Sequence, residues 1–385
     1  MNRLILVNQA VGPFYLSLIR EISASERFDS ISLITGTYDP EVLKELRSQG
    51  VEVNCCASYN NTKMCLRLLT WLLFSLQVVA HVIKEMCLGQ RLNTLWLFSS
   101  NPPILSPLLS LLQLTRFIKY YYFVLDIYPA VLISSGTLKL NSAFYRIWET
   151  FDRIFVERTS KVLTLDKGMK SKLISLYPSL IDEKNIDVIP LELGIHSKAH
   201  VKREDNFIAQ DLGYNDNDLV IGYAGNLGVG HDFSFLFSRE IKLDHLNFIF
   251  IGGGAQYPKL KGAFNDNYRF QFRSFYPHES LDCVISLPDI SIITIEDNSD
   301  SLMIPSKFYS CVAYGVPVLF IGPANHHLAE IVRKFNLGFT VVNGDIRNLN
   351  KILVQLNRAE LSVAFKTNFN AYIASLNHID LGRIF

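Results

Sequence analysis

The chain contains 385 residues, of which 49% are hydrophobic and 19% are charged. A chain of this length is too long for a single hydrophobic core, which predicts two domains. Its 37 Lys and Arg against 36 Asp and Glu give a formal charge of +1, so no overall basic surface indicates a nucleic-acid-binding protein.

Apolar runs of strand length alternate with helical stretches along the whole chain. This order is typical of parallel sheets with helices on both faces. The expected strands span 4–7, 30–34, 51–55, 94–98, 120–125, 161–165, 186–189, 219–224, 247–251, 268–272, 290–295, 317–321 and 339–342.

The polar stretch 196–218 separates the two series of strands. We therefore predict an α/β protein with two Rossmann-like, doubly wound domains that face each other across a cleft. Residues 1–195 form the first domain and residues 196–365 the second. Residues 366–385 are a carboxyl-terminal helical segment and a candidate for packing back on the first domain.

In the first half, candidate site residues follow three expected strands. Gly12 lies in the loop after 4–7, Asn101 in a Ser-Asn-Pro-Pro turn after 94–98, and Asp126 after 120–125. A carboxylate behind so apolar a strand is costly to bury unless it faces the cleft or a partner. The alternative interpretation is that Asp126 caps a helix and that Asn101 belongs to a structural turn.

Residues 63–88, from Lys63 to Leu88, form a long expected helix. Its polar residues fall on one narrow stripe at helical spacing, and the remaining surface is apolar. Charges interrupt it too often for a membrane-spanning helix. Two interpretations stay open, a helix packed in the core of the first domain and a helix lying in a membrane interface. The second predicts exposed Leu, Phe or Trp side chains.

In the second half, glycine-rich turns follow expected strands. Gly225-Asn226-Leu227-Gly228 follows 219–224 and precedes an expected helix at 233–240, and a run containing Gly253 follows 247–251. Strand, glycine turn and helix together are typical of a backbone cradle for a pyrophosphate. The Asn226 amide and the Gly228 N–H would position phosphate or sugar, or would only shape the turn. His231 is either a phosphate donor or a polar residue near a cap.

The segment 304–319 predicts a loop, a helix, a tight turn and a buried strand. Pro305 suits the first helical position, where its missing N–H costs nothing. Ser306 and Lys307 then lie in the first turn, where free N–H groups and the helix dipole favour an anion. Lys307 is either a phosphate ligand or a solvated surface lysine.

YAGNLGVGHD, FIGGGA and MIPSKFYSCVAYGVPVL, in this order, resemble the donor half of GT-B glycosyltransferases of the retaining family four type. SNPP and YYFVLDIYP resemble the acceptor-side loops of the bacterial subgroup that builds colanic acid, O-antigen or capsule. The resemblance implies that the donor nucleotide binds the second half, that the acceptor binds the first, and that anomeric configuration is retained.

The chain departs from the family pattern at two places. Asn226 and His231 stand where many members carry an Arg and a Lys, and Ser310 stands where the second Glu of a pair is usual. We therefore expect Lys307 to supply the phosphate charge and Glu296, or alternatively Asp297, to contact the donor sugar. The expected donor-binding residues are Gly225, Asn226, Gly228, His231, Gly253, Tyr276, Glu296, Pro305, Ser306, Lys307 and Ser310.

The predicted function is transfer of a sugar from a nucleotide-diphosphate donor to a lipid-linked or oligosaccharide acceptor in cell-surface polysaccharide synthesis. Asp126 and Lys307 are the expected catalytic residues, and the lysine charge makes a metal or other cofactor unnecessary. Two rival functions stay open. One is a nucleotide-sugar epimerase of the same fold, and the other is a non-catalytic partner subunit of a transferase.

The six cysteines contain no Cys-x-x-Cys pair and no zinc spacing, so we expect reduced and mostly packed thiols. The apolar run after Met1 is shorter than a secretory signal requires. We therefore expect a cytoplasmic active site. The membrane-interface interpretation of residues 63–88 adds peripheral contact to the inner face of the membrane, and the core-helix interpretation does not.

Overall fold

The chain folds into two units. Unit 1 comprises Met1–Gly194, Ser301–Ile304 and His378–Phe385, and unit 2 comprises Ile195–Asp300 and Pro305–Asn377. The computed structural model describes residues 2–60, 64–89, 93–134, 136–178, 182–228, 230–243, 245–358, 361, 365–376 and 381–385.

Unit 1 is built on a parallel sheet of seven strands in the order β3-β2-β1-β4-β5-β6-β7. The strands are β1 Arg3–Val7, β2 Ser30–Thr35, β3 Glu52–Cys55, β4 Thr94–Ser99, β5 Lys119–Phe123, β6 Lys161–Thr164 and β7 Ile186–Val188. Its helices are α1 Pro13–Ala24, α2 Pro40–Ser48, α3 Met64–Cys87, α4 Leu105–Leu111, α5 Ala130–Ser134, α6 Ala143–Arg158, α7 Lys167–Leu176 and α16 Leu381–Ile384.

Unit 2 is built on a parallel sheet of six strands in the order β10-β9-β8-β11-β12-β13. The strands are β8 Val220–Asn226, β9 Asn247–Gly253, β10 Phe270–Arg273, β11 Ile290–Thr294, β12 Val318–Gly322 and β13 Gly338–Val342. Its helices are α8 Phe207–Asp211, α9 Tyr257–Phe264, α10 Leu281–Ser286, α11 Lys307–Tyr314, α12 His327–Phe335, α13 Ile346–Gln355 and α15 Lys366–Ser375.

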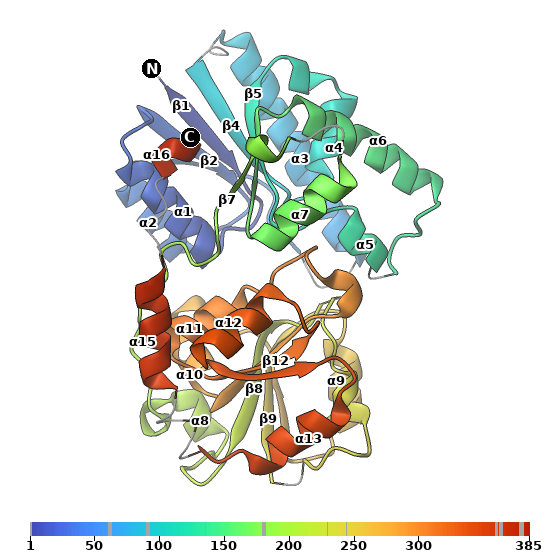
Figure 1. Cartoon of the computed structure of the whole chain (residues 1–385). Coiled ribbons are helices and arrows are strands. Elements are labelled where there is room, and N and C mark those ends of the chain that lie inside the picture. The colour runs from blue at the N-terminus through green and yellow to red at the C-terminus, as the bar shows by residue number, and fades with distance from the viewer. Residues whose placement is uncertain are drawn as a thin grey trace. The chain divides into compact units, whose positions relative to one another are not determined.

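Each sheet reverses its winding direction once, between β1 and β4 in unit 1 and between β8 and β11 in unit 2. Because parallel crossovers are right-handed, helices before and after the reversal cover opposite faces of the sheet (Figure 1). Loops leave such a sheet in opposite directions at the reversal and open a crevice outside the carboxyl ends of the strands. The expected site residues follow β1, β4 and β5 in unit 1 and β8, β9, β10 and β11 in unit 2.

The prediction of parallel α/β sheets is confirmed, and each of the expected strands is present within about two residues of its predicted bounds. The helix expected at 233–240 is wrong, because only the single 3₁₀ turn Ser234–Phe237 forms there. Phe235 and Leu236 are buried within this turn, and Ser238 leaves it in extended conformation. Phe235 and Leu236 are thus buried from a short turn, without an amphipathic helix.

The carboxyl-terminal segment divides between the units. In α15, Tyr372 packs on Phe335 of α12 at 4.8 Å between ring centroids, within unit 2. Phe385, just after α16, stacks on Tyr121 of β5 at 5.8 Å, within unit 1. Of the segment 366–385 that was a candidate for packing back on the first domain, residues 378–385 belong to unit 1, whereas α15 belongs to unit 2.

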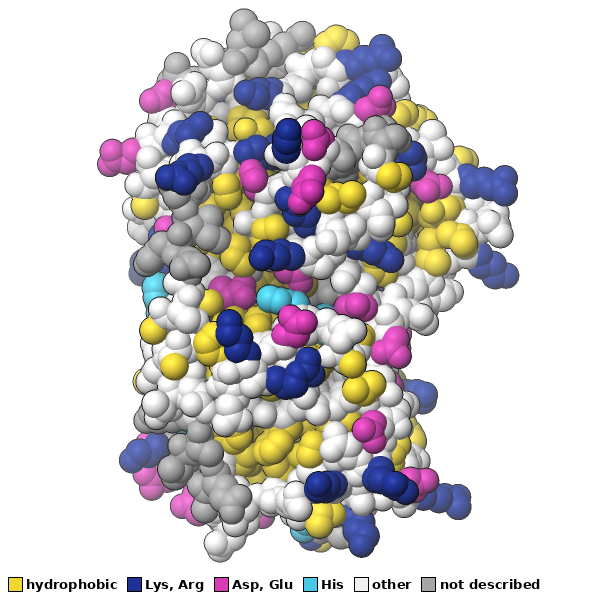
Figure 2. Space-filling model, in the orientation of Figure 1, with side chains coloured by type: hydrophobic (Ala, Val, Ile, Leu, Met, Phe, Trp, Pro, Cys, Tyr) yellow, Lys and Arg dark blue, Asp and Glu magenta, His cyan; other side chains and the backbone are white. Residues whose placement is uncertain are grey.

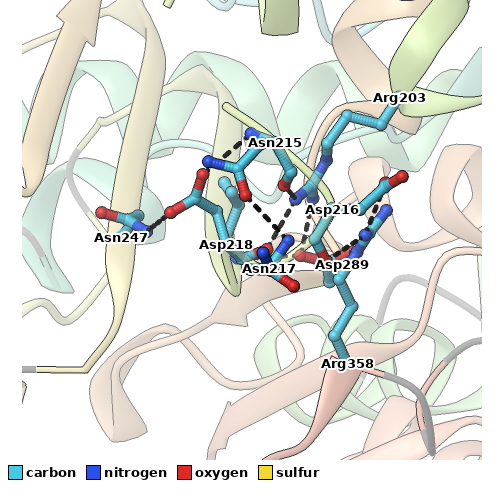
Figure 3. A network of polar contacts seen from close by, with 9 residues as sticks. Arg203, Asn215, Asp216, Asn217, Asp218, Asn247, Asp289 and Arg358 are labelled. Atoms are coloured by element: carbon cyan, nitrogen blue, oxygen red, sulfur yellow. Dashed lines mark hydrogen bonds and ion pairs between the residues drawn. The ribbon is translucent and has the colours of Figure 1, made fainter. Parts of the chain in front are cut away.

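The amino ends of β8 and β11 are joined by a buried ionic network (Figure 3). Asp289 accepts hydrogen bonds from Arg203 at 2.7 Å, from Arg358 at 2.9 Å and from the Val220 N–H at 2.8 Å. The side chains of Arg203 and Asp289 are only 6% and 11% exposed. These charges are therefore held by one another and fix the start of two adjacent strands.

An Asp-x-Asp spacing that the sequence interpretation overlooked, Asp216-Asn217-Asp218, belongs to the same network (Figure 3). Asp216 pairs with Arg358 at 2.7 Å. Asp218 accepts from the Asn215 N–H at 2.8 Å and from Asn247 at 3.2 Å. Both carboxylates are thus occupied by protein donors at the end of the sheet opposite the glycine turns.

Candidate functional site

The glycine turns after β8 and β9 meet backbone to backbone. Gly225 and Gly252 are register partners, with φ of +135° and +139°. A Cβ at Gly252 would overlap the Gly225 carbonyl, so this approach requires glycine. Gly253 lies beside Phe275, a side chain that is 55% exposed. The two turns therefore form one continuous backbone surface at the carboxyl edge of the unit 2 sheet.

Asn226 lies at the end of β8, with its side chain exposed above these turns. A Cβ at Gly228 would lie 2.8 Å from the Asn226 Nδ2, so the amide covers this glycine. Gln256 holds the same loop from below, because its amide donates to the carbonyls of Gly228 at 2.9 Å and His231 at 2.5 Å. The loop is thus fixed by a glutamine that sequence reasoning missed.

Lys307 begins α11 and points its ammonium at β8. Its Nζ donates to the Tyr223 hydroxyl and lies 3.9 Å from the centroid of that ring. The Tyr223 hydroxyl in turn donates to the Asn226 carbonyl at 2.9 Å. Burial lowers the pKa of Lys307 to about 7. Among the described residues no carboxylate forms an ion pair with Lys307, so its charge is available to a ligand.

Pro305 was expected at the first helical position, and this detail is wrong. The helix begins at Lys307, with Ser306 at the N-cap and no side-chain capping bond. The carbonyl of Pro305 accepts from the Phe308 N–H at 3.1 Å, so Pro305 starts the turn that leads into α11. Ser306 remains exposed, while Ser310 lies one turn further along the helix.

His231 is buried beneath this surface. Its Nδ1 lies 2.6 Å from the Thr294 carbonyl, the last residue of β11, and therefore donates to it. Burial and the neighbouring Lys307 charge lower the pKa of His231 to about 3. A neutral imidazole whose proton is on Nδ1 offers only an acceptor at Nε2. We therefore interpret His231 as a fixed neighbour of Lys307 rather than a cationic phosphate ligand.

Two carboxylates lie near each other after β8 and β11. The Glu296 N–H donates to the Gly230 carbonyl at 2.8 Å, which ties the two loops together. Burial, and then the charge of Asp232, raise the pKa of Glu296. Asp232, which the sequence interpretation did not select, exchanges hydrogen bonds with Thr294 at 3.2 and 2.8 Å through its backbone.

A cavity of about 180 Å³ extends beneath Lys307, and its wall is largely apolar. Ser310 and Phe275 contribute to its lining. Tyr276 does not line this cavity, because its ring packs against Phe207 at 6.1 Å between centroids. The aromatic side chain at this level of the site is therefore Phe275, one residue before the predicted one. The lining residues are Gly222, Tyr223, Ala224, Gly225, Ile249, Ile251, Phe275, Leu281, Val284, Ile285, Pro288, Ser291, Lys307, Ser310 and Cys311.

In unit 1, hydrogen bonds bring the loops after β1, β4 and β5 together. The Gln9 N–H donates to the Asn101 carbonyl at 3.1 Å, and the Asp126 N–H donates to the Ser100 hydroxyl at 3.1 Å. Gly12 is exposed at the N-cap of α1, with open space where a Cβ would lie. The three residues predicted for the acceptor side therefore lie at one edge of the sheet.

Asp126 has the surroundings of a functional carboxylate. Burial raises its pKa to about 6. Within the described ranges its carboxylate has no hydrogen-bond or ion-pair partner, and it caps no helix there. Perturbed, unpaired carboxylates at a strand end are candidate acid–base groups.

The described residues contain no group of three His, Cys, Asp or Glu side chains arranged to hold a metal ion. All six cysteines are free thiols. The expectation that most are packed is wrong, because Cys55, Cys65 and Cys87 are exposed and only Cys56 and Cys311 are buried.

No family model matches the chain. Probable glycosyltransferase WbjE of Pseudomonas aeruginosa is 23% identical over 299 residues, which cover 72% of this chain and 71% of WbjE. The crystal structure of Anabaena HepE in complex with UDP-glucose matches at a TM-score of 0.65 with 14% identity, covering 97% of this chain and 95% of HepE. Sucrose-phosphate synthase from Thermosynechococcus elongatus matches at a TM-score of 0.66 with 13% identity, covering 98% and 95%.

The sequence relative is named as a probable glycosyltransferase. At such identities the structural likeness establishes the fold. The chain has the two parallel-sheet α/β domains of the GT-B fold.

Proposed function

We propose that this protein is a glycosyltransferase that moves a sugar from a nucleotide-diphosphate donor to a lipid-linked or oligosaccharide acceptor in cell-surface polysaccharide synthesis. The observation that carries the proposal is the Lys307 ammonium, which lies unpaired at the start of α11 beside the glycine turns after β8 and β9. The names of WbjE and of the UDP-glucose complex of HepE support the same class of reaction.

The chemistry assigned to Lys307 follows from its position. A diphosphate on the glycine surface would accept from backbone N–H groups and from the ammonium. As the bond from the sugar to the diphosphate breaks, negative charge grows on the leaving group, and a fixed cation stabilises it. Tyr223 orients the amine and His231 stays neutral below it, so the local positive charge is that of Lys307 alone.

The remaining donor-side residues receive distinct roles. Asn226 and Gly228 contact the diphosphate or the reacting sugar, and Glu296 contacts the sugar hydroxyls. Phe275 and the cavity beside it offer an apolar surface to one end of the donor.

In unit 1, Asp126 is the carboxylate that serves the acceptor hydroxyl, with Gly12 and Asn101 on the same edge. We propose retention of anomeric configuration, because the ordered motifs resemble retaining enzymes.

The first test is a screen of nucleotide sugars by melting temperature, since a ligand that binds only the folded state stabilises it by mass action. UDP-glucose is one member of a panel that varies the base and the sugar. We expect one donor to raise the melting temperature and Lys307→Ala to abolish most of that rise. No rise with any donor would contradict the proposal.

The second test incubates the stabilising donor with the purified chain and lipid-linked or oligosaccharide acceptors from surface polysaccharide synthesis. Transfer that requires acceptor supports the proposal, and the anomer of the product reports retention. A product formed without acceptor, carrying an inverted sugar carbon, would indicate the epimerase instead. Donor binding without transfer or hydrolysis would indicate a partner subunit.

A further inference from the structure

The outward face of α3 is apolar along almost its full length. Seven of its Leu and Ile side chains, at positions 66, 68, 69, 72, 73, 76 and 83, are between 40% and 49% exposed. They recur at spacings of three and four residues, so they share one face of the helix. Gln77 and Lys84 are the only exposed residues with polar side chains on the described part of this helix. We call this surface the leucine face. On an ordinary surface helix the exposed side is polar, whereas here it is apolar.

The opposite face of α3 is fixed to unit 1. Trp71 and Phe74 are 4% and 0% exposed, which corrects the expectation that the aromatic side chains of this segment are on the surface. The Gln9 amide donates to the Thr70 carbonyl at 3.0 Å, Gln77 accepts from the Ala57 N–H at 2.7 Å, and Glu85 pairs with Arg3 at 2.7 Å.

These bonds hold α3 along its length. The expectation that charges interrupt this segment too often for a membrane span is wrong, because by length and composition α3 is apolar enough to cross a membrane. About one third (33%) of its apolar window is buried, and that side is anchored to unit 1. A helix bound in this way lies along a surface and does not span it.

Neighbouring helices extend the apolar surface. Leu111 at the end of α4, and Leu112 and Phe117 after it, are 53%, 46% and 49% exposed. Phe144 and Ile147 of α6 are 59% and 58% exposed. The connections from β3 to β4, from β4 to β5 and from β5 to β6 all run in the same direction across the sheet. Because parallel crossovers are right-handed, α3, α4 and α6 cover the same face of the sheet. Figure 2 shows hydrophobic side chains on the surface of unit 1 over the region of α6.

The charge of this region differs from that of the whole chain. The described residues 64–89 and 93–125 contain four Lys or Arg, Arg67, Lys84, Arg116 and Lys119, and a single acidic residue, Glu85, which is a formal charge of +3 in a chain of +1. Glu85 is already paired with Arg3. An apolar helical face inside a basic region is complementary to an anionic bilayer, where each Lys or Arg near the surface contributes about 1 kcal/mol.

We propose that the leucine face docks unit 1 on an anionic lipid bilayer, with α3 lying in the plane of the interface. The charge favours lipid over a second copy of the chain. A symmetric dimer through this face would place two basic regions against each other, whereas an anionic bilayer places opposite charges together. The proposal requires neither donor nor acceptor, so it stands or falls independently of the transferase activity.

The test is flotation of the full chain with vesicles of phosphatidylcholine and phosphatidylglycerol. The wild type should float, and Leu69→Ser/Leu73→Ser/Leu76→Ser should lower the bound fraction about tenfold or more, because three half-exposed leucines no longer enter the interface. The matched control is Tyr268→Ser/Val342→Ser/Val354→Ser, which removes side chains of unit 2 that are 77%, 45% and 50% exposed. It should float like the wild type.

A charge variant separates the electrostatic contribution to membrane binding from the contribution of the apolar side chains. Lys84→Glu/Arg116→Glu should weaken binding to anionic vesicles and leave binding to pure phosphatidylcholine unchanged, and added salt should reproduce this loss in the wild type. Circular dichroism melting is the control that each variant is folded. A wild type that does not float overturns the proposal. So does a chain that is dimeric without vesicles and becomes monomeric in the leucine variant, because a second copy then covers the face.

Discussion

Two groups of buried charge lie at opposite ends of the sheet in unit 2. At the amino ends of β8 and β11, Asp289 accepts from two arginines and a backbone N–H. At the carboxyl ends, Lys307 has a tyrosine hydroxyl and no carboxylate among the described residues. A buried charge that is paired within the protein serves stability, whereas an unpaired one costs stability unless a ligand completes it. The contrast separates the end of the sheet that we assign to stability, here called the structural end, from the end that we propose binds the donor, here called the functional end.

The largest expected effect belongs to the structural end. Asp289→Ala leaves Arg203 buried without its partner, so the free energy of unfolding should fall by about 3–5 kcal/mol. Urea unfolding measures this change. Asp216→Ala is the control, because its carboxylate is exposed and its loss should change stability little. A stable Asp289→Ala protein with weakened donor binding would reverse our assignment of the two ends.

At the functional end, Lys307→Ala should weaken binding of a nucleoside diphosphate by about 1.5–3 kcal/mol, the range for hydrogen bonds to charged groups. Binding of the nucleoside should change much less, and calorimetry compares the two. The free energy of unfolding should not fall, because an unpaired ammonium is removed. Lys351→Ala, an exposed lysine of α13, is the control. Equal losses for both ligands would make Lys307 a structural residue.

The unpaired carboxylate of unit 1 allows the same comparison in the other sheet. Asp126→Asn should lower turnover more than about tenfold, with little change in donor affinity, if the carboxylate acts in the transition state. Steady-state kinetics and a melting curve measure both quantities. A lower melting temperature with normal turnover of the folded fraction would assign Asp126 to the structural class.

The last comparison is a pH dependence. The pKa of Lys307 is about 7 in the folded chain against 10.5 for an ordinary lysine. The unfolded state therefore binds more protons between these values, and stability should rise with pH across this range. A bound diphosphate favours the ammonium, so donor binding takes up a proton and affinity should fall above about pH 7. Calorimetry in buffers of different ionisation enthalpy detects the proton. Lys307→Met should lack both slopes, and unchanged slopes would contradict the assignment.

The sequence alone determined the strands, because runs such as 316–321 are apolar throughout and lie between glycines, and 290–295 is apolar except for Ser291 and Thr294 and lies between Asp289 and Glu296. It also located the glycine turns and the helix that begins near Lys307. It placed these segments after strands of one parallel sheet, where strand ends meet. These are local patterns, so no knowledge of distant contacts was needed.

Tertiary structure decided which charges are paired. Asp289 and Arg358 are far apart in the chain, and Lys307 reaches Tyr223 only because α11 packs beside β8. Tertiary structure also decided which side of α3 is buried, because its sequence places apolar residues on most of the helix surface. Only packing decides that Trp71 and Phe74 enter the core while Leu69 and Leu73 face outward, since periodicity describes the helix and not what covers each side of it.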